Sequence, residues 1–298
     1  MKILITGANG LLGQHLVDLL LKTTDHALVA TGIGPQRTAF KDDRLTYISL
    51  DICDGVAVHS LMEQVQPGVV IHCAALTQAD ECELNEVKCW DINVTATRFL
   101  VDAAKKCNAF FIFLSTDFVF DGLHGPYKEE DGTNPSSYYG SSKVAAEKAV
   151  LESGLSNAVV RTCLVYGDTV SGTRSNIITW VKTNLEQGKP IKVVSDQWRT
   201  PTYIEDLARG ILLIAEKKAT GIFHISGEEM LTPYEIAMAT AEYMQFDKSL
   251  IEKVDAAVFT QRAKRPAKTG FIINKAKAVL GFKPVSFAEG LKLVLDKK

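Results

Sequence analysis

The sequence has no long apolar run, and this absence argues against one class of protein. No stretch approaches the roughly 18 consecutive apolar residues that a membrane-spanning helix needs. Met1 is followed directly by a short strand pattern, without the basic, apolar and small-residue regions of a secretion signal. We therefore expect a protein without a membrane partner.

Cysteine pairing is also absent from the sequence. Six cysteines are scattered along the chain without a Cys-x-x-Cys pair: Cys53, Cys73, Cys82, Cys89, Cys107 and Cys163. Such scatter favours free, buried thiols over disulfides or zinc ligands, as in the reducing cytoplasm. The sequence also offers no carboxylate cage dedicated to a metal. We expect a cytoplasmic protein without a metal site.

Excess charge of either sign is missing as well. The 33 basic and 35 acidic residues leave a net charge of −2, which provides no basic field for nucleic acid. The hydrophobic content of 46% and the charged content of 23% are ordinary for a globular protein. The partner that we expect is a small molecule, and 298 residues can bury a large core around it.

The first half of the chain alternates between two patterns. Short, apolar, β-branched runs predict strands at 2–6, 27–31, 45–50, 69–72, 109–115 and 158–164. Longer patterns between them predict helices at 11–22, 56–64, 87–107 and 137–152. Near-continuous apolar strands separated by helices indicate a parallel sheet covered on both faces. We predict a doubly wound α/β fold of the Rossmann type.

The second half of the chain has a different succession of predicted elements, and it begins with a polar loop at 168–175. Its predicted elements are helices at 176–186, 204–216 and 233–243, strands at 191–194 and 221–225, and short helices near 274–280 and 287–296. The sequence thus predicts a dinucleotide-binding domain over 1–167. A smaller α/β substrate-binding portion over 168–298 would be interleaved with it.

A glycine-rich turn follows the first predicted strand. Gly7, Gly10 and Gly13 form G-x-x-G-x-x-G, and Leu11 and Leu12 begin the helix behind the turn. In such a turn the first glycine permits the tight bend, the second the close approach of a phosphate, and the third close helix–strand packing. A purely structural turn is the alternative. Placement directly after an apolar strand favours a dinucleotide pyrophosphate at the helix N-terminus.

The end of the next strand bears on which dinucleotide binds. It reads Thr31-Gly32, without the acidic residue that usually holds a ribose 2′-hydroxyl, and Arg37 follows shortly. The missing acid leaves room for a 2′-phosphate, so we favour NADP over NAD. We expect further cofactor contacts at the ends of the third and fourth strands, from Asp51, Ile52, Cys73, Ala74 and Ala75.

Tyr139 and Lys143 are the most informative pair in the sequence. They lie four residues apart on a predicted helix and therefore share one face. A free phenol has a pKa of about 10, and a neighbouring ammonium favours the phenolate, so we expect Lys143 to lower the pKa of Tyr139. Lys143 would also donate to the nicotinamide ribose. Reduction of a ketone needs a hydride and a proton, and Tyr139 would supply the proton.

A hydroxyl group near this pair should hold the carbonyl oxygen. The strand at 109–115 runs into Ser115-Thr116-Asp117, at the carboxyl edge of the sheet, where open α/β sheets bind ligands. We assign Thr116 to the carbonyl oxygen and Ser115 to the cofactor. The alternative is a pair of hydroxyls that only cap the end of the strand.

Together these motifs resemble the extended short-chain dehydrogenase/reductase family over nearly the whole chain. The family resemblance also includes the stretches 115–122, 126–129 and 161–167. Within that family the sequence is similar to the dTDP-4-dehydrorhamnose reductase group, through the stretches 115–120, 196–197 and 201–202. The resemblance implies an NAD(P)H-dependent reductase of the 4-keto group of a nucleotide-linked deoxysugar. It places the catalytic roles on Thr116, Tyr139 and Lys143.

The resemblance also concerns the substrate. It implies substrate contacts from Thr116 and Asp117, and it places Arg199 and Arg265 where relatives hold a diphosphate, a role that suits a planar guanidinium. Phe118 replaces an acid that the dehydratases carry, so we do not expect dehydration. Leu164 stands where the reductase group usually has tryptophan. The identity of the sugar therefore stays open.

Two other functions stay open at this point. A sugar-nucleotide epimerase would oxidise and re-reduce one carbon with tightly held NAD. A regulatory subunit, such as the β-subunit of methionine adenosyltransferase, would bind NADP while its catalytic residues stayed idle. The intact Thr116, Tyr139 and Lys143 favour an enzyme. The predicted helices 87–107 and 137–152 could pair with those of a twin subunit or lie within one chain.

Overall fold

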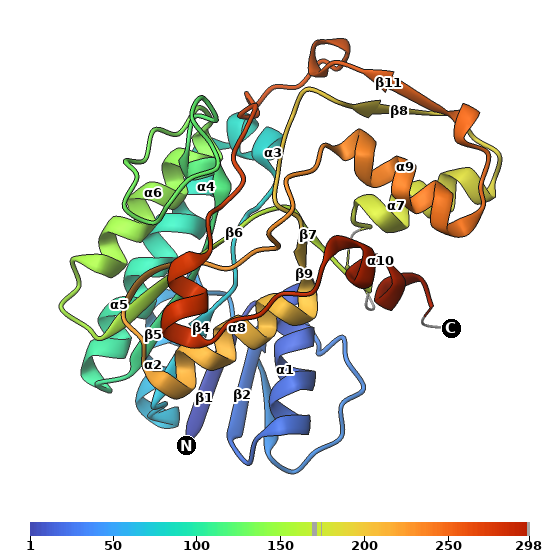
Figure 1. The fold of residues 1–298 in the computed structure, drawn as a ribbon. Helices are drawn as coiled ribbons and strands as arrows, with labels where there is room; N and C mark the ends of the chain where they lie inside the picture. The colour runs from blue at the N-terminus through green and yellow to red at the C-terminus, as the bar shows by residue number, and fades with distance from the viewer. Residues whose placement is uncertain (169–171, 174, 297–298) are drawn as a thin grey trace.

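The computed structural model describes residues 1–168, 172–173 and 175–296. Within them, seven strands form the central sheet: β1 (Lys2–Thr6), β2 (Ala27–Gly32), β3 (Leu45–Ser49), β4 (Val69–His72), β5 (Phe110–Thr116), β6 (Asn157–Thr162) and β10 (Gly221–His224). Their order is β10-β6-β5-β4-β1-β2-β3, and all neighbours are parallel (Figure 1). This order confirms the predicted doubly wound sheet.

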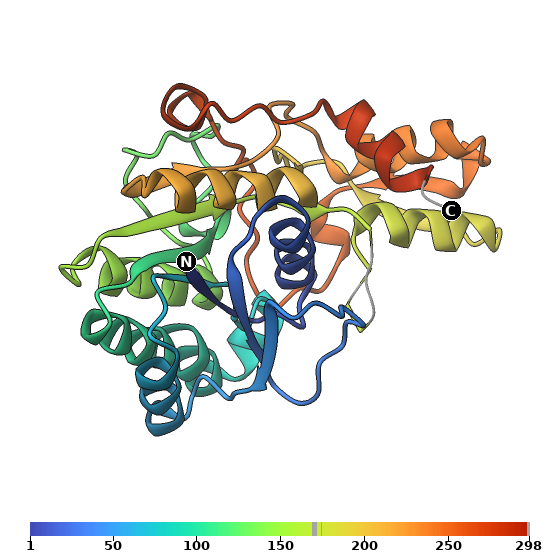
Figure 2. The same cartoon turned by 90° about the horizontal axis from the view of Figure 1, so that it is seen from below.

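Helices cover both faces of the sheet (Figure 2). On one face α1 (Leu11–Thr23) packs against α8 (Ile204–Lys217), and on the other lie α2 (Gly55–Val65), α5 (Ala96–Lys106) and α6 (Tyr138–Leu151). The alternation of side chains along a strand supplies both cores. In β1, Ile3 and Ile5 pack into the cluster beneath α1 and α8, whereas Leu4 packs into the cluster beneath α2 and α5.

A smaller part lies beside the carboxyl ends of the strands (Figure 1). Helices α7 (Ile177–Glu186), α9 (Pro233–Met244) and α10 (Phe287–Leu295) belong to it, with the parallel strands β8 (Ile191–Val194) and β11 (Ile251–Val254). α8 and β10 both follow residue 168 in the chain. β10 nevertheless completes the central sheet and α8 covers one of its faces, so the two parts interleave. The division at residue 167 stays a prediction, and the predicted loop at 168–175 lies partly outside the described residues.

The predicted single helix at 87–107 is wrong in its middle. The structure has α4 (Glu86–Trp90), a π-helical turn (Asp91–Thr95) and then α5, and the short α3 (Ala79–Leu84) precedes them. The π-helical turn adds a residue to the helix, and it carries the Asn93 side chain to a contact outside its own helix. Asn93 Oδ1 accepts from Leu76 N at 2.8 Å and Nδ2 donates to Leu76 O at 3.0 Å. A periodic apolar pattern does not reveal such a turn.

None of the described helices combines the length and the apolar composition that crossing a membrane requires.

Candidate active site

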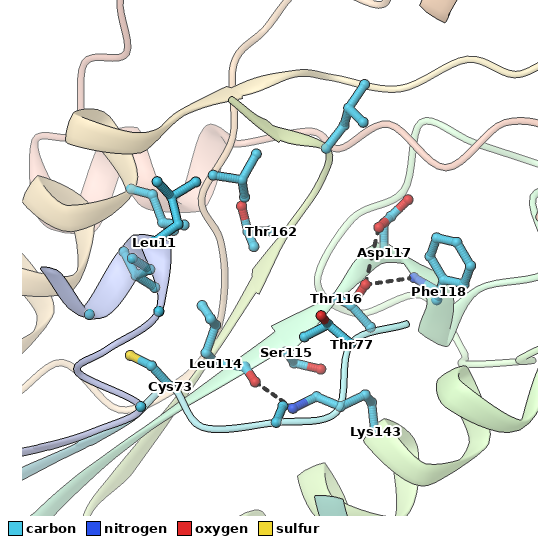
Figure 3. A pocket seen from close by; sticks show the side chains of 18 of the residues that line it. Leu11, Cys73, Thr77, Leu114, Ser115, Thr116, Asp117, Phe118, Lys143 and Thr162 are labelled. Carbon is cyan, nitrogen blue, oxygen red and sulfur yellow. Dashed lines mark hydrogen bonds between the residues drawn. The ribbon is translucent and has the colours of Figure 1, made fainter. Parts of the chain in front are cut away.

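A cavity of about 500 Å³ opens at the carboxyl ends of β1, β4 and β5 (Figure 3). The sheet order reverses between β1 and β4, and ligands bind at such a switch point in open α/β sheets. Turns and strand ends that lie far apart in sequence contribute to its wall, as in Gly10, Cys73, Thr116, Tyr139, Val165 and Ile204. The topology therefore gathers most of the predicted site residues around one space.

The glycine turn fits a phosphate group. Gly7 has a φ of +69°, and a Cβ there would lie 2.7 Å from Ala74 N, so only glycine is suited to this position. At Gly10 a Cβ would meet no atom but Gly7 O, at 3.2 Å, and would otherwise project into open space. Helix α1 begins behind Gly10 without a side-chain cap. Its first N–H groups, at Leu11 and Leu12, are thus directed where a pyrophosphate would bind.

A second hollow, of about 420 Å³, shares Gly10, Leu11 and Ala75 with the cavity and contains the exposed Arg37. Asn9, which the sequence reasoning missed, shapes its wall. Asn9 Oδ1 accepts from Arg37 N at 3.0 Å, and Nδ2 donates to Pro35 O at 3.1 Å. Arg37 Nη1 donates to Gly172 O at 2.7 Å. A guanidinium that lines the same hollow as Gly10 of the glycine turn fits a 2′-phosphate.

Three of the predicted cofactor contacts lie away from the cavity wall. Thr31 is fully buried, and its hydroxyl donates to Ile5 O at 3.3 Å within the sheet. Ile52 packs in the core beneath α2, and the exposed Asp51 accepts from Cys53 N. The position of the cavity therefore does not support the predicted contacts of these three residues with the cofactor. Among the predicted residues after β4, Cys73 and Ala75 line the cavity, while Ala74 lies against Gly7.

Tyr139 and Thr116 both line the cavity. Tyr139 lies in the first turn of α6, whose N-cap Ser137 accepts from Gly140 N at 3.2 Å. Thr116 ends β5, and its Oγ accepts from Phe118 N at 3.3 Å (Figure 3). The helix start and the strand end thus place both candidate catalytic hydroxyl groups in the wall of the same cavity.

The predicted direction of the Tyr139 pKa is wrong for the chain as it stands. Burial raises the pKa of this phenol above its usual value, and the neighbouring Thr116 side chain offsets only part of that effect. Sequence spacing places Lys143 on the same face but does not say how deep that face lies. The phenol is therefore fully protonated at neutral pH.

Lys143 is buried against the sheet. Its Nζ donates to Leu114 O at 2.7 Å (Figure 3), and it lies 4.0 Å from the centre of the Phe113 ring. Burial lowers the pKa of this ammonium to about 8, although Glu147 acts in the opposite direction. Because that pKa is still above neutral, Lys143 is mainly charged at pH 7.

Ser115 lines the cavity, but its hydroxyl is turned to a buried carboxylate. It donates to Glu147 Oε1 at 2.5 Å, and Arg161 donates to both Glu147 oxygens, at 3.0 and 2.7 Å. This arrangement holds β5, β6 and α6 together beneath Lys143. Its contact with Glu147 makes Ser115 a support of the strand end, and the predicted contact with a cofactor stays a prediction.

The two arginines predicted to hold a diphosphate are each paired with a carboxylate. Arg199 is 5% exposed, and its Nε lies 3.3 Å from Asp117 Oδ2. Arg265 is less buried and donates to Asp80 at 2.7 Å. Asp117 lines the cavity, and its contact with the substrate stays a prediction. Arg199, by contrast, is directed at Asp117 and at backbone carbonyls, and this placement does not favour a substrate role.

Arg265 borders a third hollow, of about 420 Å³, beside the smaller part of the molecule. Trp180 and Phe259 also line this hollow, and both are more than one-third exposed. Ser175 and Asn176 border both this hollow and the one at Arg37, so the hollows adjoin. Exposed aromatic faces near a guanidinium provide stacking and anion contacts together.

Leu164 is a further residue of interest on the cavity wall. Its φ of +39° is unusual for a residue with a side chain, and such conformations are concentrated at functional sites. The sequence showed a departure from the reductase pattern here but could not show the backbone conformation.

Known proteins resemble this chain over its full length. The RmlD substrate binding domain family matches residues 1–298. Methionine adenosyltransferase 2 subunit beta of Rattus norvegicus is 33% identical over 308 aligned positions, which cover 100% of this chain and 89% of that protein. A dTDP-4-dehydrorhamnose reductase of Clostridium acetobutylicum gives a TM-score of 0.88 at 30% identity and covers 99% of each chain. The dTDP-4-dehydrorhamnose reductase of Bacillus anthracis in complex with NADP gives 0.87 at 27%, over 100% of this chain and 99% of the other.

Proposed function

We propose that this chain, which belongs to the RmlD substrate binding domain family, is an NAD(P)H-dependent reductase of the 4-keto group of a nucleotide-diphospho-deoxysugar. The observation that carries this proposal is that Tyr139, Thr116 and Lys143 line one cavity together with the uncapped start of α1. A proton donor and a phosphate-binding helix terminus in one space are what carbonyl reduction requires.

The chain binds a nicotinamide dinucleotide, as its relative from Bacillus anthracis does. The bound dinucleotide supplies the hydride. The turn at Gly10 and the first N–H groups of α1 would hold the pyrophosphate, and Lys143 would reach the nicotinamide ribose. Arg37 and the absence of an acid after β2 favour NADP, because a guanidinium pairs with a 2′-phosphate but not with a 2′-hydroxyl.

The chain's own residues would manage the proton. A phenol whose pKa is raised by burial stays neutral at pH 7 and is therefore a proton donor, as reduction demands. Tyr139 would give its proton to the carbonyl oxygen while Thr116 fixes the direction of the phenol. The Lys143 ammonium would then stabilise the phenolate until solvent returns a proton.

The hollow beside Trp180 would accept the nucleotide. Trp180 or Phe259 can stack on a base, and Arg265 can face the diphosphate when it exchanges its contact with Asp80. Asp117 lines the cavity next to Thr116, where the keto-sugar would be placed. The substrate would thus span from the smaller part of the molecule to the sheet edge.

The test compares Tyr139→Phe with Tyr138→Phe, a matched variant on the neighbouring residue. We expect Tyr139→Phe to bind NADPH normally by fluorescence and to lose about 10²- to 10⁴-fold in NADPH oxidation with nucleotide-linked 4-keto sugars. Tyr138→Phe should stay within about twofold of the parent, because Tyr138 is not the proposed proton donor. Equal rates in the parent and Tyr139→Phe would overturn the assignment.

A regulatory subunit is the second candidate, and one observation favours it: the 33% identity to methionine adenosyltransferase 2 subunit beta. This function would leave the Tyr139 site loaded with NADP but idle. An epimerase would differ from both by isomerising a sugar nucleotide without net use of NADPH. Absorbance at the NADPH band during turnover, together with a search for a co-purifying adenosyltransferase, separates the three.

A further inference from the structure

Two cysteines lie directly behind the candidate acid. Cys82 is on α3 and Cys89 is on α4, and both are fully buried. They pack in one buried cluster with Tyr139 and Ala263. Neither thiol has a part in the proposed reduction.

The two thiols have different surroundings. Cys89 Sγ accepts from Asn93 Nδ2 at 3.4 Å and lies 3.5 Å from Ser142 Oγ. The neighbouring Cys82 thiol is the main cause that lowers the pKa of Cys89, and the contacts with Ser142 and Asn93 act in the same direction. The Cys89 thiol in turn raises the pKa of Cys82. One thiol is thus prepared as a nucleophile, while its neighbour keeps its proton.

The other cysteines lack this environment. Burial raises the pKa of Cys53 to about 11 and of Cys73 to about 12, and it also raises the pKa of Cys107 and of Cys163. Cys53 is nevertheless exposed at the surface. Exposure and thiolate character therefore point to different cysteines, which gives an experiment a clear contrast.

We propose that Cys82 and Cys89 are a redox-sensitive pair that closes to a disulfide under hydroperoxide and thereby weakens cofactor binding. The link to the cavity runs through Leu76. Cys82 Sγ donates to Leu76 O at 3.6 Å, and Asn93, which contacts Cys89, bonds both Leu76 N and Leu76 O. The neighbours of Leu76 in the chain, Ala75 and Thr77, line the cavity.

The chemistry balances with hydrogen peroxide as the oxidant. The Cys89 thiolate attacks one peroxide oxygen, so that an S–O bond forms, the O–O bond breaks and hydroxide leaves. Cys82 sulfur then attacks Cys89 sulfur, an S–S bond forms, and the second hydroxide leaves. The hydroxides take up the Cys82 proton and one solvent proton. Two thiol groups lose two electrons, and peroxide becomes two waters.

Oxidation removes two contacts that hold the cavity edge. Cys82 loses its S–H and so can no longer donate to Leu76 O, and Cys89 loses the thiolate character that favours its contact with Asn93. Tyr139 borders both the cavity and the thiol cluster, so the two lie close together. α3 and α4 have only 6 and 5 residues, so local opening of these helices would let peroxide reach the buried thiols.

The experiment treats the full chain with hydrogen peroxide, alkylates it under denaturing conditions and digests it with trypsin. Cleavage after Lys88 places Cys82 and Cys89 on different peptides, and the peptide 89–98 carries no other cysteine. We expect a disulfide-linked peptide pair, a whole-chain mass lower by about 2 Da, and complete reversal by dithiothreitol. Cys82→Ser should abolish the link, and Cys53→Ser, the matched control, should leave it intact.

A second readout is the affinity for NADPH, which rests on the cofactor site proposed above. We expect oxidation to weaken binding at least fivefold in the parent and in Cys53→Ser, and to leave Cys82→Ser and Cys89→Ser unaffected. Absence of the Cys82–Cys89 link, or oxidation of Cys53 in preference, would overturn the proposal whether or not the chain is a reductase. A link that forms without any change in NADPH affinity would overturn its regulatory part.

Discussion

Arg199 Nε lies 3.3 Å from Asp117 Oδ2, and the two side chains are 6% and 5% exposed. The other guanidinium nitrogens donate to the backbone carbonyls of Trp198, Pro266 and Ala267. Thr269 Oγ also donates to Asp117. A charge pair therefore connects the end of β5, where the candidate catalytic hydroxyl lies, with two segments from the second half of the chain.

Removing the arginine should destabilise the whole chain. Arg199→Met leaves a buried carboxylate without its charge partner, and breaking such a pair costs about 3–5 kcal/mol. Arg265→Met is the comparison, because its pair with Asp80 is partly exposed and should contribute about 1 kcal/mol or less. Urea unfolding measures both free energies. Losses of the same size would show that the Arg199 pair is no stronger than a surface contact.

Two glycines should respond differently to the same substitution. Gly7→Ala places a Cβ 2.7 Å from Ala74 N at a positive φ, so we expect a loss of more than about 1 kcal/mol in unfolding free energy. Gly10→Ala has room within the protein but fills the space for a phosphate. We expect it to fold like the parent and to bind NADPH at least tenfold more weakly in a fluorescence titration. Undiminished binding by Gly10→Ala would place the pyrophosphate elsewhere.

Local patterns predicted most of the framework. Short apolar, β-branched runs revealed the strands, and the spacing of Gly7, Gly10 and Gly13 revealed the turn, because both depend on neighbours in the chain. The match of the RmlD substrate binding domain family along residues 1–298 also confirms the family resemblance that the motifs indicated. The same reasoning found Tyr139 and Thr116, which line the same cavity.

Properties that depend on depth or on distant partners escaped the sequence. The pKa of Tyr139 is raised because the phenol is buried, which i,i+4 spacing cannot reveal. Arg199 resembles a diphosphate ligand by position, yet its carboxylate partner lies 82 residues earlier in the chain. Asn93 was overlooked because its role depends on a π-helical turn.

Lys143 should lower the unfolding free energy of the chain, although the proposed reduction depends on it. Its folded pKa of about 8 lies below the usual 10.5, so folding disfavours the charged form. Both states are charged below pH 8, and there the penalty is complete; it disappears as the pH rises above 10.5. We therefore expect Lys143→Met to raise the unfolding free energy at pH 7 by about 1–3 kcal/mol while reduction is lost.

The control for this variant is Lys148→Met, on an exposed position of the same helix, which should change stability by less than about 0.5 kcal/mol. Thermal unfolding at pH 7 and pH 10 measures the effect. A Lys143→Met chain that is less stable than the parent at pH 7 would mean that the contact with Leu114 O outweighs the burial penalty.

His72 should make the fold sensitive to acid. Thr97 Oγ already donates to Asn93 O, so it can only accept from His72 Nε2, at 3.0 Å. Thr6 Oγ lies 2.7 Å from Nδ1 and donates to it. The ring is therefore neutral with its hydrogen on Nε2. Burial, and then the Lys143 charge, lower the pKa of His72 to about 3.

A lowered folded pKa gives stability that is present above the unfolded value of 6.5 and lost as the pH falls towards 3. In that range the unfolded chain takes up a proton that the folded chain refuses, at about 1.4 kcal/mol per pH unit. We expect His72→Gln to flatten the dependence by about one proton between pH 6 and 4, whereas the exposed His124→Gln keeps the parent's slope. Urea unfolding across this range measures both slopes. If His72→Gln keeps the full slope, the buried imidazole must accept a proton in the folded state.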